Sequence, residues 1–196
     1  MTGRLFDRVA AGVGMALISP LLLGIAVAIW LDDGGPVLFR QQRVGRHGRP
    51  FFMWKFRTMV RDAERKGRQI TVGRDPRITR TGHWLRRYKL DELPQLWNVV
   101  RGEMRLVGPR PEVQRYVDLY TPQQRAVLEL MPGITDPASM AYRNESDLLA
   151  QTEDPEQFYI SEVMPEKIRI NLDYAARRTF RSDLMILFKT VFGMRT

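Results

Sequence analysis

The stretch VAAGVGMALISPLLLGIAVAIWL, residues 9–31, runs for twenty-three positions without a charged side chain. A helix of about 20 apolar residues spans a hydrocarbon core of about 30 Å, so this stretch is long enough to be a membrane segment. Ser19 and Pro20 interrupt it near the middle. Proline removes a helical hydrogen bond, here the one to the Ala16 carbonyl, and clashes with the preceding turn. The stretch therefore predicts a membrane helix that is kinked at Ser19-Pro20.

The kink allows two topologies. Each half of the segment is about 16 Å long at 1.5 Å per residue, which reaches about half-way through the hydrocarbon core. Basic residues flank both ends, and such flanks favour the cytoplasmic side; they are Arg4, Arg8, Arg40, Arg43, Arg46 and Arg49. We therefore expect a re-entrant hairpin that enters and leaves one leaflet. A kinked spanning helix remains the alternative, whereas a signal peptide is disfavoured because no small-residue cleavage site follows.

The charge of the chain is unevenly distributed. The net charge is +9 over 196 residues, a length typical of one domain. Residues 40–110 carry nineteen Lys or Arg against six Asp or Glu, whereas residues 111–160 carry three against nine. A positive field of this kind attracts phosphates of nucleic acid, anionic lipid or a nucleotide. Because there is no cysteine and only two histidines, His47 and His83, any metal is expected to be hard and oxygen-ligated.

The rest of the pattern indicates a mostly helical domain with one β-hairpin. The runs VLFRQQR and PFFMWKFR flank the turn GRHG and predict the hairpin over residues 37–57. We expect helices over 58–67, 83–102 and 112–130 and from about 155 onwards. Loops are expected at RDPRITRTG, LVGPRPE and PGITDP, which are rich in glycine or proline. The last helix carries LMILFKTVF, whose apolar face is suited to the core or to a membrane surface.

One acidic pair and several basic residues are candidates for chemistry. Asp91 and Glu92 lie in KLDELPQLWN, where the plain interpretation is a solvated helix start. Neither a GxGxxG nor a GxxxxGK[ST] motif is present, so a dinucleotide fold or Walker site has no support. Arginine binds phosphate bidentately, and proline loops would fix its direction. The basic candidates, which with the acid pair indicate a diphosphate site, are Lys55, Arg57, Arg86, Arg110 and Arg143.

The order and spacing of these motifs resemble the bacterial sugar transferases, the small monotopic polyprenyl-phosphate phosphoglycosyl transferases of the PglC type. The similarity covers nearly the whole chain, from the Ser19-Pro20 helix to DLMILFKTV, by way of KFRTM, LDELPQLWNVVRGEM, LVGPRPE and PGIT. It implies an α+β fold: residues 1–31 form the re-entrant membrane helix, and residues 32–196 form a cytoplasmic catalytic domain with interfacial amphipathic helices. It also implies a minimal catalytic form, without the extra spans of longer relatives.

The resemblance implies a specific reaction. Asp91 would attack the sugar-bearing phosphate of a nucleotide diphosphate sugar, with UDP as the family's usual nucleotide, and carry a covalent phosphosugar. Polyprenyl (undecaprenyl) phosphate would then accept the phosphosugar at the cytoplasmic face of the bacterial inner membrane, the first membrane step of glycoconjugate or exopolysaccharide assembly. Mg²⁺ would bind at Asp91 and Glu92. The phosphate contacts would come from Arg86, Arg110 and Arg143, with Lys55 and Arg57 at the membrane side.

The chain departs from many relatives after PGIT, where Ser139 replaces a glutamine and Tyr142 a glycine, which leaves the sugar open. A homodimer is also left open. Two rival functions are a membrane-anchored basic module that binds nucleic acid or lipid, and a membrane phosphatase with the same aspartyl chemistry. The first leaves the acid pair without a purpose, and its basic residues are not interleaved with aromatic stacking groups. We therefore expect no nucleic-acid partner, and acceptor dependence would separate the second.

Overall fold

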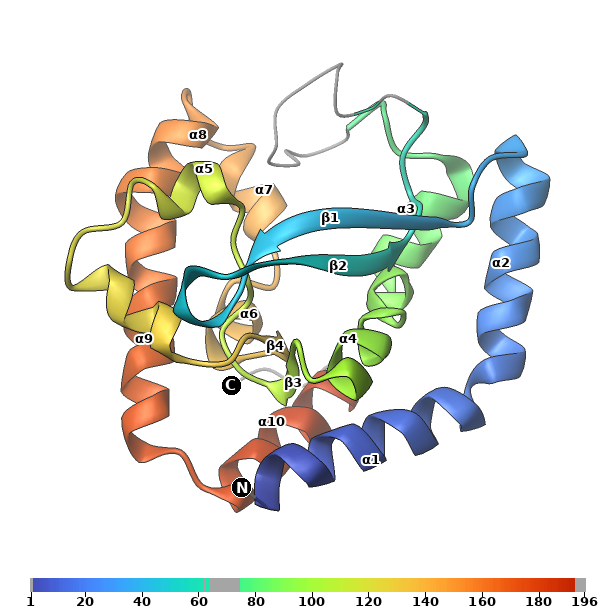
Figure 1. Ribbon diagram of the computed structural model, residues 1–196. Helices are drawn as coiled ribbons and strands as arrows, with labels where there is room; N and C mark the ends of the chain where they lie inside the picture. Colours follow the sequence, from blue (N-terminus) through green and yellow to red (C-terminus); the bar gives the residue numbers. More distant parts are fainter. Residues whose placement is uncertain (1, 62, 64–74, 193–196) are drawn as a thin grey trace.

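The computed structural model describes residues 2–61, 63 and 75–192. The described chain is mostly helical and contains two small sheets (Figure 1). The strands are β1 (Leu38–Val44), β2 (Pro50–Phe56), β3 (Arg105–Val107) and β4 (Gly133–Thr135). The α-helices are α1 (Thr2–Leu17), α2 (Ser19–Asp33), α3 (Arg80–Arg87), α4 (Gln95–Arg101), α5 (Gln114–Val117), α6 (Pro137–Ala141), α7 (Glu145–Leu149), α8 (Pro155–Phe158), α9 (Met164–Arg177) and α10 (Phe180–Phe192). Short 3₁₀-helices are η1 (Arg46–Gly48), η3 (Leu90–Glu92) and η4 (Gln124–Glu129), and η5 (Tyr159–Val163) is a π-helical turn.

The predicted kink at Ser19-Pro20 is confirmed. Helices α1 and α2 meet at an angle of 62°. The Ser19 hydroxyl donates a hydrogen bond to the Ala16 carbonyl over 2.8 Å, which satisfies the acceptor that Pro20 leaves without an N–H. Among the described residues no helix taken alone is long and apolar enough to cross a bilayer, whereas the bent pair passes that test of length and composition together.

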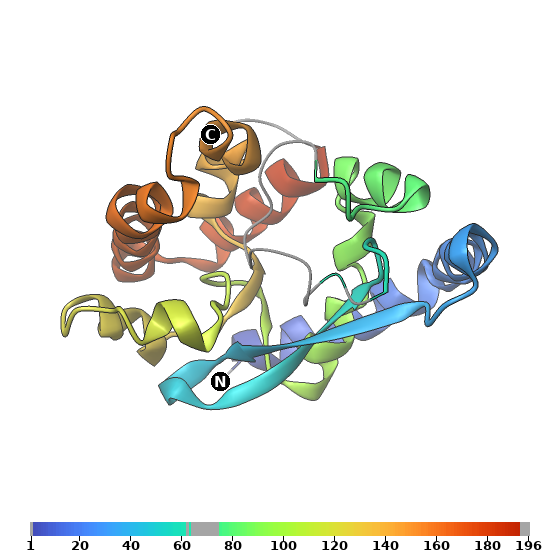
Figure 2. The same ribbon diagram turned by 90° about the horizontal axis from the view of Figure 1, so that it is seen from above.

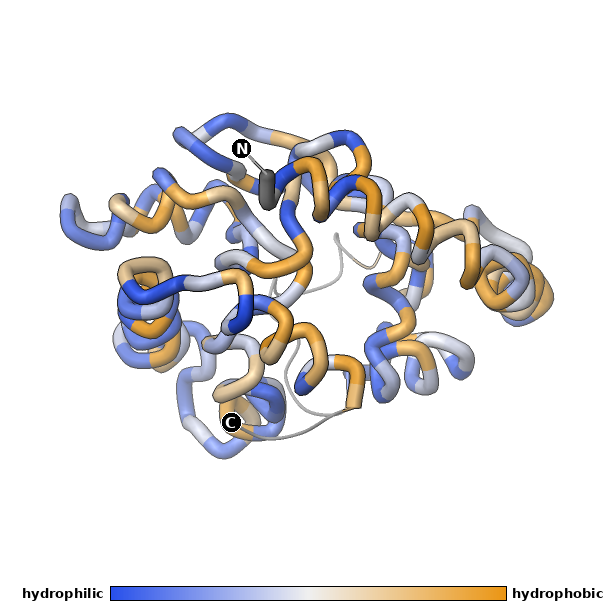
Figure 3. The backbone as a smooth tube through the Cα atoms, turned by 90° about the horizontal axis from the view of Figure 1, so that it is seen from below, coloured by the Kyte–Doolittle hydropathy of each residue, from blue (hydrophilic) through white to orange (hydrophobic). Residues whose placement is uncertain are grey.

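One side of each N-terminal helix packs on the rest of the protein. Ala11 of α1 is buried with Val99 of α4 and Met53 of β2, and Ile25 and Ile29 of α2 are buried against other core residues. Both helices also expose large apolar side chains, as does α10, and Figure 3 shows how many hydrophobic positions the three helices carry. The exposed side chains are Leu5, Phe6, Val9, Val13 and Leu17 on α1, Leu21, Leu23, Val27, Trp30 and Leu31 on α2, and Phe180, Leu184, Met185, Phe188, Val191 and Phe192 on α10.

The predicted β-hairpin is confirmed. Strands β1 and β2 are antiparallel, with Leu38 opposite Phe56 and Val44 opposite Pro50. The turn uses a left-handed conformation at His47, with φ 58°, and at Gly48, with φ 72°. Figure 2 shows the hairpin extending from the yellow segment that contains η4 to α2. Its far end therefore brings Lys55, near the end of β2, towards the segment that carries Asp91.

The single helix expected over residues 83–102 is wrong. Helix α3 ends at Arg87, Lys89 adopts a left-handed conformation with φ 57°, and η3 precedes α4. Pro94 has no N–H to donate to a preceding turn, which prevents a continuous helix through this region. Gly102 ends α4 as expected, with φ 76°. The break places Asp91 and Glu92 on a short turn between two helices.

The prediction that PGITDP is entirely a loop is wrong in part. Gly133–Thr135 forms β4, which pairs in parallel with β3. A Cβ on Gly133 would lie 2.1 Å from the backbone nitrogen of Gly108, so these two glycines permit a close approach of the two backbone segments.

Two further expectations are corrected by the structure. The helix expected over 112–130 is replaced by α5 and η4, and the loop expected at 74–82 ends at Arg80, where α3 begins. Half of the short helix predicted over 58–67 lies outside the described residues, and the described residues 58–61 are not helical.

The C-terminal helices are confirmed, and they cover the largest part of the core. Tyr116, Leu149, Tyr159 and Val163 are buried there, and Val44 joins them from the end of β1. This cluster fixes β1 and the loop before α5 relative to α9. The hairpin and the loop between β3 and α5 (residues 108–113, the GPRP loop) are thereby positioned on one framework, next to η3.

Candidate active site

The acid pair lies on η3 and is largely buried. Asp91 has an exposed fraction of 7 %, and the side chain of Glu92 has one of 15 %. The plain interpretation of a solvated helix start is therefore wrong for this pair. Two cations converge on Glu92 from separate segments: Lys55 from β2 and Arg110 from the loop after β3.

Both oxygens of Glu92 accept hydrogen bonds. Arg110 donates from Nη1 to Oε2 over 3.0 Å and from Nη2 to Oε1, which is the bidentate geometry of a strong charge-assisted pair. The ammonium of Lys55 lies 3.3 Å from Oε1. Burial raises the pKa of Glu92, but the charges of Arg110 and Lys55 outweigh it and hold that pKa well below its ordinary value. Glu92 is therefore a fixed anion.

Asp91 has a different environment. Its Oδ1 is buried and has no hydrogen-bond partner among the residues that the structure describes. Burial, followed by the adjacent charge of Glu92, raises the pKa of Asp91, and the charges of Lys55, Arg86 and Lys89 act against this rise. A buried carboxylate oxygen without a partner is costly, so the arrangement suits a group that meets a cation or an electrophile from outside the chain.

The pKa values of the surrounding cations are shifted by burial and by the charges of the acid pair. Burial lowers the pKa of Lys55 to about 8, although Glu92 acts to raise it. The charge of Glu92 raises the pKa of Arg110 despite burial. Arg86 donates from Nε to the Thr58 hydroxyl over 2.8 Å; burial lowers its pKa, and Asp91 is the first charge that opposes the change. The structure therefore brings Lys55, Arg86 and Arg110 together around the acid pair.

The other two basic candidates, Arg57 and Arg143, are placed differently from these three. Arg57 pairs with Asp33 at the end of α2, and its guanidinium packs so closely on Gly35 that a Cβ there would lie 2.4 Å from Nη1. It ties the end of β2 to the end of α2. Arg143 is exposed after α6, and it is not among the main charges that shift the pKa of Asp91 or Glu92. Neither residue contributes a described contact to the acid pair.

The segment that follows PGIT, residues 136–142, is built around Asp136. Its carboxylate accepts from the backbone N–H of Ser139 over 2.9 Å and from the Ser139 hydroxyl over 2.5 Å, and so it caps α6. The charge of Asp136 also acts to raise the pKa of Arg110. Ser139 is therefore engaged in holding the loop that adjoins the Arg110 side of the site.

Three functional candidates were missed by reasoning from the sequence. Asn98 of α4 accepts from the Trp54 N–H over 3.1 Å and donates to the Phe52 carbonyl over 2.7 Å. These bonds fasten α4, which follows the acid-pair turn, to β2. Gln95 is fully buried, and neither of its amide atoms has a described partner. Lys89 supplies both the chain reversal and a nearby positive charge. The signal for the first two was their helical spacing of three on an otherwise apolar helix.

The residues present are compatible with Mg²⁺. The unpartnered Oδ1 of Asp91 is an available hard oxygen, and Glu92 is ionised beside it. The described residues contain no group of three His, Cys, Asp or Glu side chains that could hold a metal ion by themselves. Mg²⁺ commonly binds through one or two carboxylates together with substrate phosphates and water, so this donor set fits an ion that arrives with a diphosphate.

Comparison with known proteins gives a consistent result over the whole chain. A family model described as bacterial sugar transferase matches residues 1–196. The chain is 43% identical over 188 residues to an uncharacterized sugar transferase, EpsL, of Bacillus subtilis (strain 168), covering 96% of this chain and 84% of the relative. It is 38% identical over 191 residues, 95% of this chain, to the UDP-glucose:undecaprenyl-phosphate glucose-1-phosphate transferase of Escherichia coli (strain K12).

A third relative is the UDP-N-acetylgalactosamine-undecaprenyl-phosphate N-acetylgalactosaminephosphotransferase of Aeromonas hydrophila, 35% identical over 190 residues and 94% of this chain. The chain spans 41% of that relative's length and 38% of the length of the Escherichia coli relative. The match to the family model extends from α1 through the acid pair to α10. This chain belongs to the bacterial sugar transferase family.

Proposed function

We propose that the chain transfers a sugar phosphate from a nucleotide diphosphate sugar to polyprenyl phosphate, with Asp91 as the covalent nucleophile. The donor nucleotide is UDP and the acceptor undecaprenyl phosphate, by analogy with the names of the relatives from Escherichia coli and Aeromonas hydrophila. Those relatives use glucose and N-acetylgalactosamine, respectively. Ser139 and Tyr142 lie in the departing segment and are where we expect the sugar preference of this chain to be set.

The observation that carries the proposal is the difference between two neighbouring carboxylates. Glu92 is held on both oxygens by Arg110 and Lys55, whereas Oδ1 of Asp91 has no partner in the described structure. A nucleophile needs a lone pair that is not engaged by another group, whereas both carboxylate oxygens of Glu92 are already engaged by cations. Asp91 is therefore the better candidate for attack.

The proposed reaction has two displacements. An oxygen of Asp91 attacks the phosphorus that bears the sugar, an acyl-phosphate bond forms, and the phosphoanhydride bond breaks to release nucleoside monophosphate. An oxygen of polyprenyl phosphate then attacks the same phosphorus, which forms polyprenyl diphosphate sugar and frees the Asp91 carboxylate. Lys55, Arg86 and Arg110 lie where they can offset negative charge on the phosphoryl oxygens during both steps.

Mg²⁺ bound at Asp91 and Glu92 with the donor phosphates would supply further neutralisation of phosphoryl charge. The protein's own contribution is to keep Glu92 ionised and to hold it against β2 and the GPRP loop. Asn98 keeps α4, and with it the acid-pair turn, against β2. These contacts preorganise the charges before substrate binds.

We further propose that α1 and α2 form a re-entrant hairpin at the cytoplasmic face of the inner membrane. The support is the 62° bend, the Ser19 bond to the Ala16 carbonyl and the apolar faces that both helices expose. Exposed apolar residues of α10 lie alongside, with Phe6 and Phe180 in edge contact at 5.2 Å between ring centroids. Cysteines at positions 3 and 48 should both be shielded from an impermeant external thiol reagent; labelling of only one would indicate a crossing.

The deciding experiment uses enzyme, Mg²⁺ and a nucleotide sugar labelled in the sugar, without polyprenyl phosphate. We expect nucleoside monophosphate in an amount equal to the enzyme and label on a peptide that contains Asp91. Subsequent addition of polyprenyl phosphate should move the label to lipid. Release only after lipid is added would indicate direct attack in a ternary complex, and continuous release without lipid would favour a phosphatase.

A further inference from the structure

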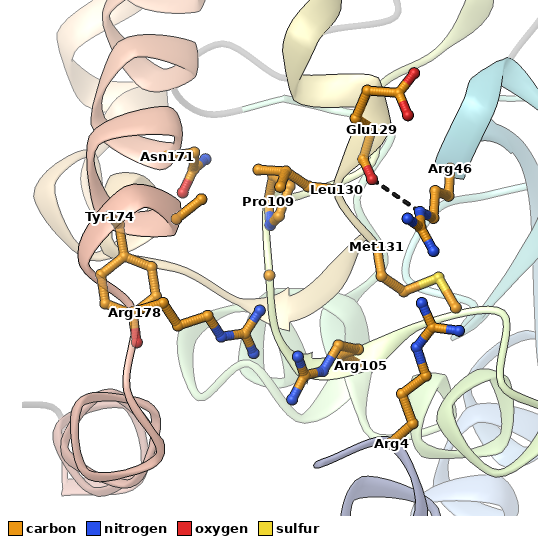
Figure 4. Close-up of a pocket in the computed structure, with 12 residues that line it drawn as sticks. Arg4, Arg46, Arg105, Pro109, Glu129, Leu130, Met131, Asn171, Tyr174 and Arg178 are labelled. Carbon is orange, nitrogen blue, oxygen red and sulfur yellow. Dashed lines mark hydrogen bonds between the residues drawn. The ribbon is translucent and has the colours of Figure 1, made fainter. Parts of the chain in front are cut away.

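A basic cavity lies apart from the acid pair, between α1, the β3 loop and α9. It has a volume of about 190 Å³ and is lined by four arginines: Arg4, Arg46, Arg105 and Arg178. Figure 4 shows these side chains reaching it from different parts of the fold, together with Tyr174 and Asn171. The main charges that shift the pKa of Asp91 come from Glu92, Lys55, Arg86 and Lys89, none of which lines this cavity.

Two of the four arginines are already neutralised. Arg178 pairs with Asp183 over 2.7 Å, and Arg105 pairs with Asp7 over 2.6 Å. These contacts hold the two guanidinium groups in place. The cavity is therefore a built feature of the fold and not a gathering of free surface side chains.

The other two arginines carry unbalanced charge. Arg4 has no hydrogen bond or ion pair with any residue that the structure describes, and Arg46 donates from Nε to the Glu129 carbonyl over 2.8 Å. The Glu129 carboxylate lies 2.9 Å from His47 instead, and it points away from Arg4 and Arg105 in Figure 4. Like charges that converge on one cavity repel each other, so an anion placed among them would be stabilised.

The surroundings of the cavity identify the kind of anion. Arg4 is followed by Leu5 and Phe6 on α1, and Arg178 lies two residues before the exposed Phe180 of α10. Leu5 is 68% exposed and Phe180 is 55% exposed. A phosphate in the cavity would thus have apolar surface beside it for acyl chains. A free inorganic anion would gain nothing from that surface.

We propose that this cavity binds the phosphate of an anionic glycerophospholipid headgroup, with the acyl chains along the exposed faces of α1 and α10. With α1 and α2 placed in the membrane as proposed above, the site would orient the protein on the bilayer. Pro109 lines the cavity and the next residue, Arg110, holds Glu92, so an occupied cavity would also steady the loop that supports the acid pair.

The test is a calorimetric titration of the detergent-purified protein with dihexanoyl phosphatidylglycerol, which measures the binding affinity. The matched variants are Arg4→Gln with Arg46→Gln, and Arg8→Gln with Arg49→Gln. Both pairs remove one arginine from α1 and one from the hairpin turn, but only the first pair lines the cavity. Removal of the cavity pair should weaken binding about tenfold or more, whereas the control pair should change it less than about twofold.

Other probes separate the alternatives. Dihexanoyl phosphatidylcholine and inorganic phosphate should bind at least about tenfold more weakly than phosphatidylglycerol, because each lacks part of the recognised chemistry. Arg4→Lys with Arg46→Lys should retain most of the affinity if charge is recognised. Equal losses in both glutamine pairs, equal binding of inorganic phosphate, or competition by polyprenyl phosphate would each overturn the proposal. Thermal unfolding of every variant confirms that a loss of binding does not reflect unfolding.

Discussion

The GPRP loop contributes to two buried clusters of charged side chains, through Arg110 to one and through Glu112 to the other, and the two clusters are built differently. Arg110 reaches Glu92 beside Asp91, whereas Glu112 meets Arg43 at 3.2 Å on the other side. Oε1 of Glu112 also accepts from the Val113 N–H over 2.8 Å, and its Oε2 accepts from the Tyr159 hydroxyl. The Arg43 guanidinium donates further to Gln41 and to the Pro111 carbonyl. Every charge in this second cluster is matched within the chain.

The cluster around Asp91 is not complete in this way, because one buried carboxylate oxygen has no described partner. Burial raises the pKa of Tyr159 well above its ordinary value, with Glu112 as the next cause, so the Glu112 cluster is shifted too. A shifted pKa therefore does not separate a structural cluster from a reactive one. The unpartnered oxygen does, since it leaves an interaction for a substrate to supply.

The largest expected effect comes from Asp91→Asn. It preserves the shape of the side chain but removes the anionic nucleophile, and kcat/KM should fall on the order of 10⁴-fold or more. The free energy of unfolding should stay the same or rise, because a buried charge with a raised pKa is removed. Single-turnover release of nucleoside monophosphate and thermal unfolding measure the two quantities. Activity within tenfold of wild type would contradict the role of Asp91.

The opposite pattern is expected for Glu112→Gln. This change leaves the buried Arg43 without its carboxylate, and removal of one partner of a buried pair costs about 3 kcal/mol of stability. Activity per folded molecule should remain within about threefold of wild type, because Glu112 makes no described contact with the acid pair. Denaturant unfolding and active-site titration check both parts. A large loss of activity in fully folded protein would show that the two clusters are coupled.

A smaller effect concerns the pH dependence of the reaction. The pKa of Lys55 is lowered to about 8 by burial, so its ammonium charge is present below that pH and is lost above it. We expect kcat/KM of the wild type at pH 9 to be about tenfold below its plateau at neutral pH. Lys55→Arg should remove this alkaline limb, because arginine keeps its charge throughout the range. An unchanged limb in the arginine variant would assign it to another group.

The sequence predicted those features that depend on local chemistry. The bend at Ser19-Pro20, the hairpin around GRHG and the end of α4 at Gly102 each follow from one or two residues with restricted conformations. The acid pair and its basic partners were candidates from their residue types and loops, and the motif resemblance supplied their roles; the contacts of Lys55 and Arg110 with Glu92 agree with that grouping. Local patterns were sufficient here because each motif lies within a few residues.

The features that were missed depend on tertiary contacts. The pairing of β3 with β4 joins Arg105–Val107 to Gly133–Thr135, and a stretch of three residues carries no periodicity that would reveal it. The asymmetry between Asp91 and Glu92 arises because Arg110 arrives from a distant loop at one carboxylate only. Arg57 was expected at the membrane side of the site, and its pairing with Asp33 at the end of α2 joins residues that lie far apart along the chain. No pattern along the chain distinguishes these partners in advance.

The smallest expected effect concerns the two non-glycine residues described with positive φ, Lys89 at 57° and His47 at 58°. A left-handed conformation costs a side chain about 1 kcal/mol, so Lys89→Gly and His47→Gly should each raise the free energy of unfolding by up to that amount. The gain is partly offset by the greater freedom of glycine in the unfolded chain. Chemical denaturation of both variants measures the change.

The two variants should differ in activity. Lys89 precedes the acid pair, and its charge acts on both Asp91 and Glu92, whereas His47 lies in the hairpin turn and pairs with Glu129. Lys89→Gly should therefore lower kcat/KM several-fold as it stabilises the fold, while His47→Gly should leave kcat/KM unchanged. Lys89→Met removes the charge but keeps the strained conformation, so it should reproduce the loss of activity without the gain in stability. If Lys89→Met is fully active, the left-handed turn at Lys89 serves only to reverse the chain, and its charge has no part in the site.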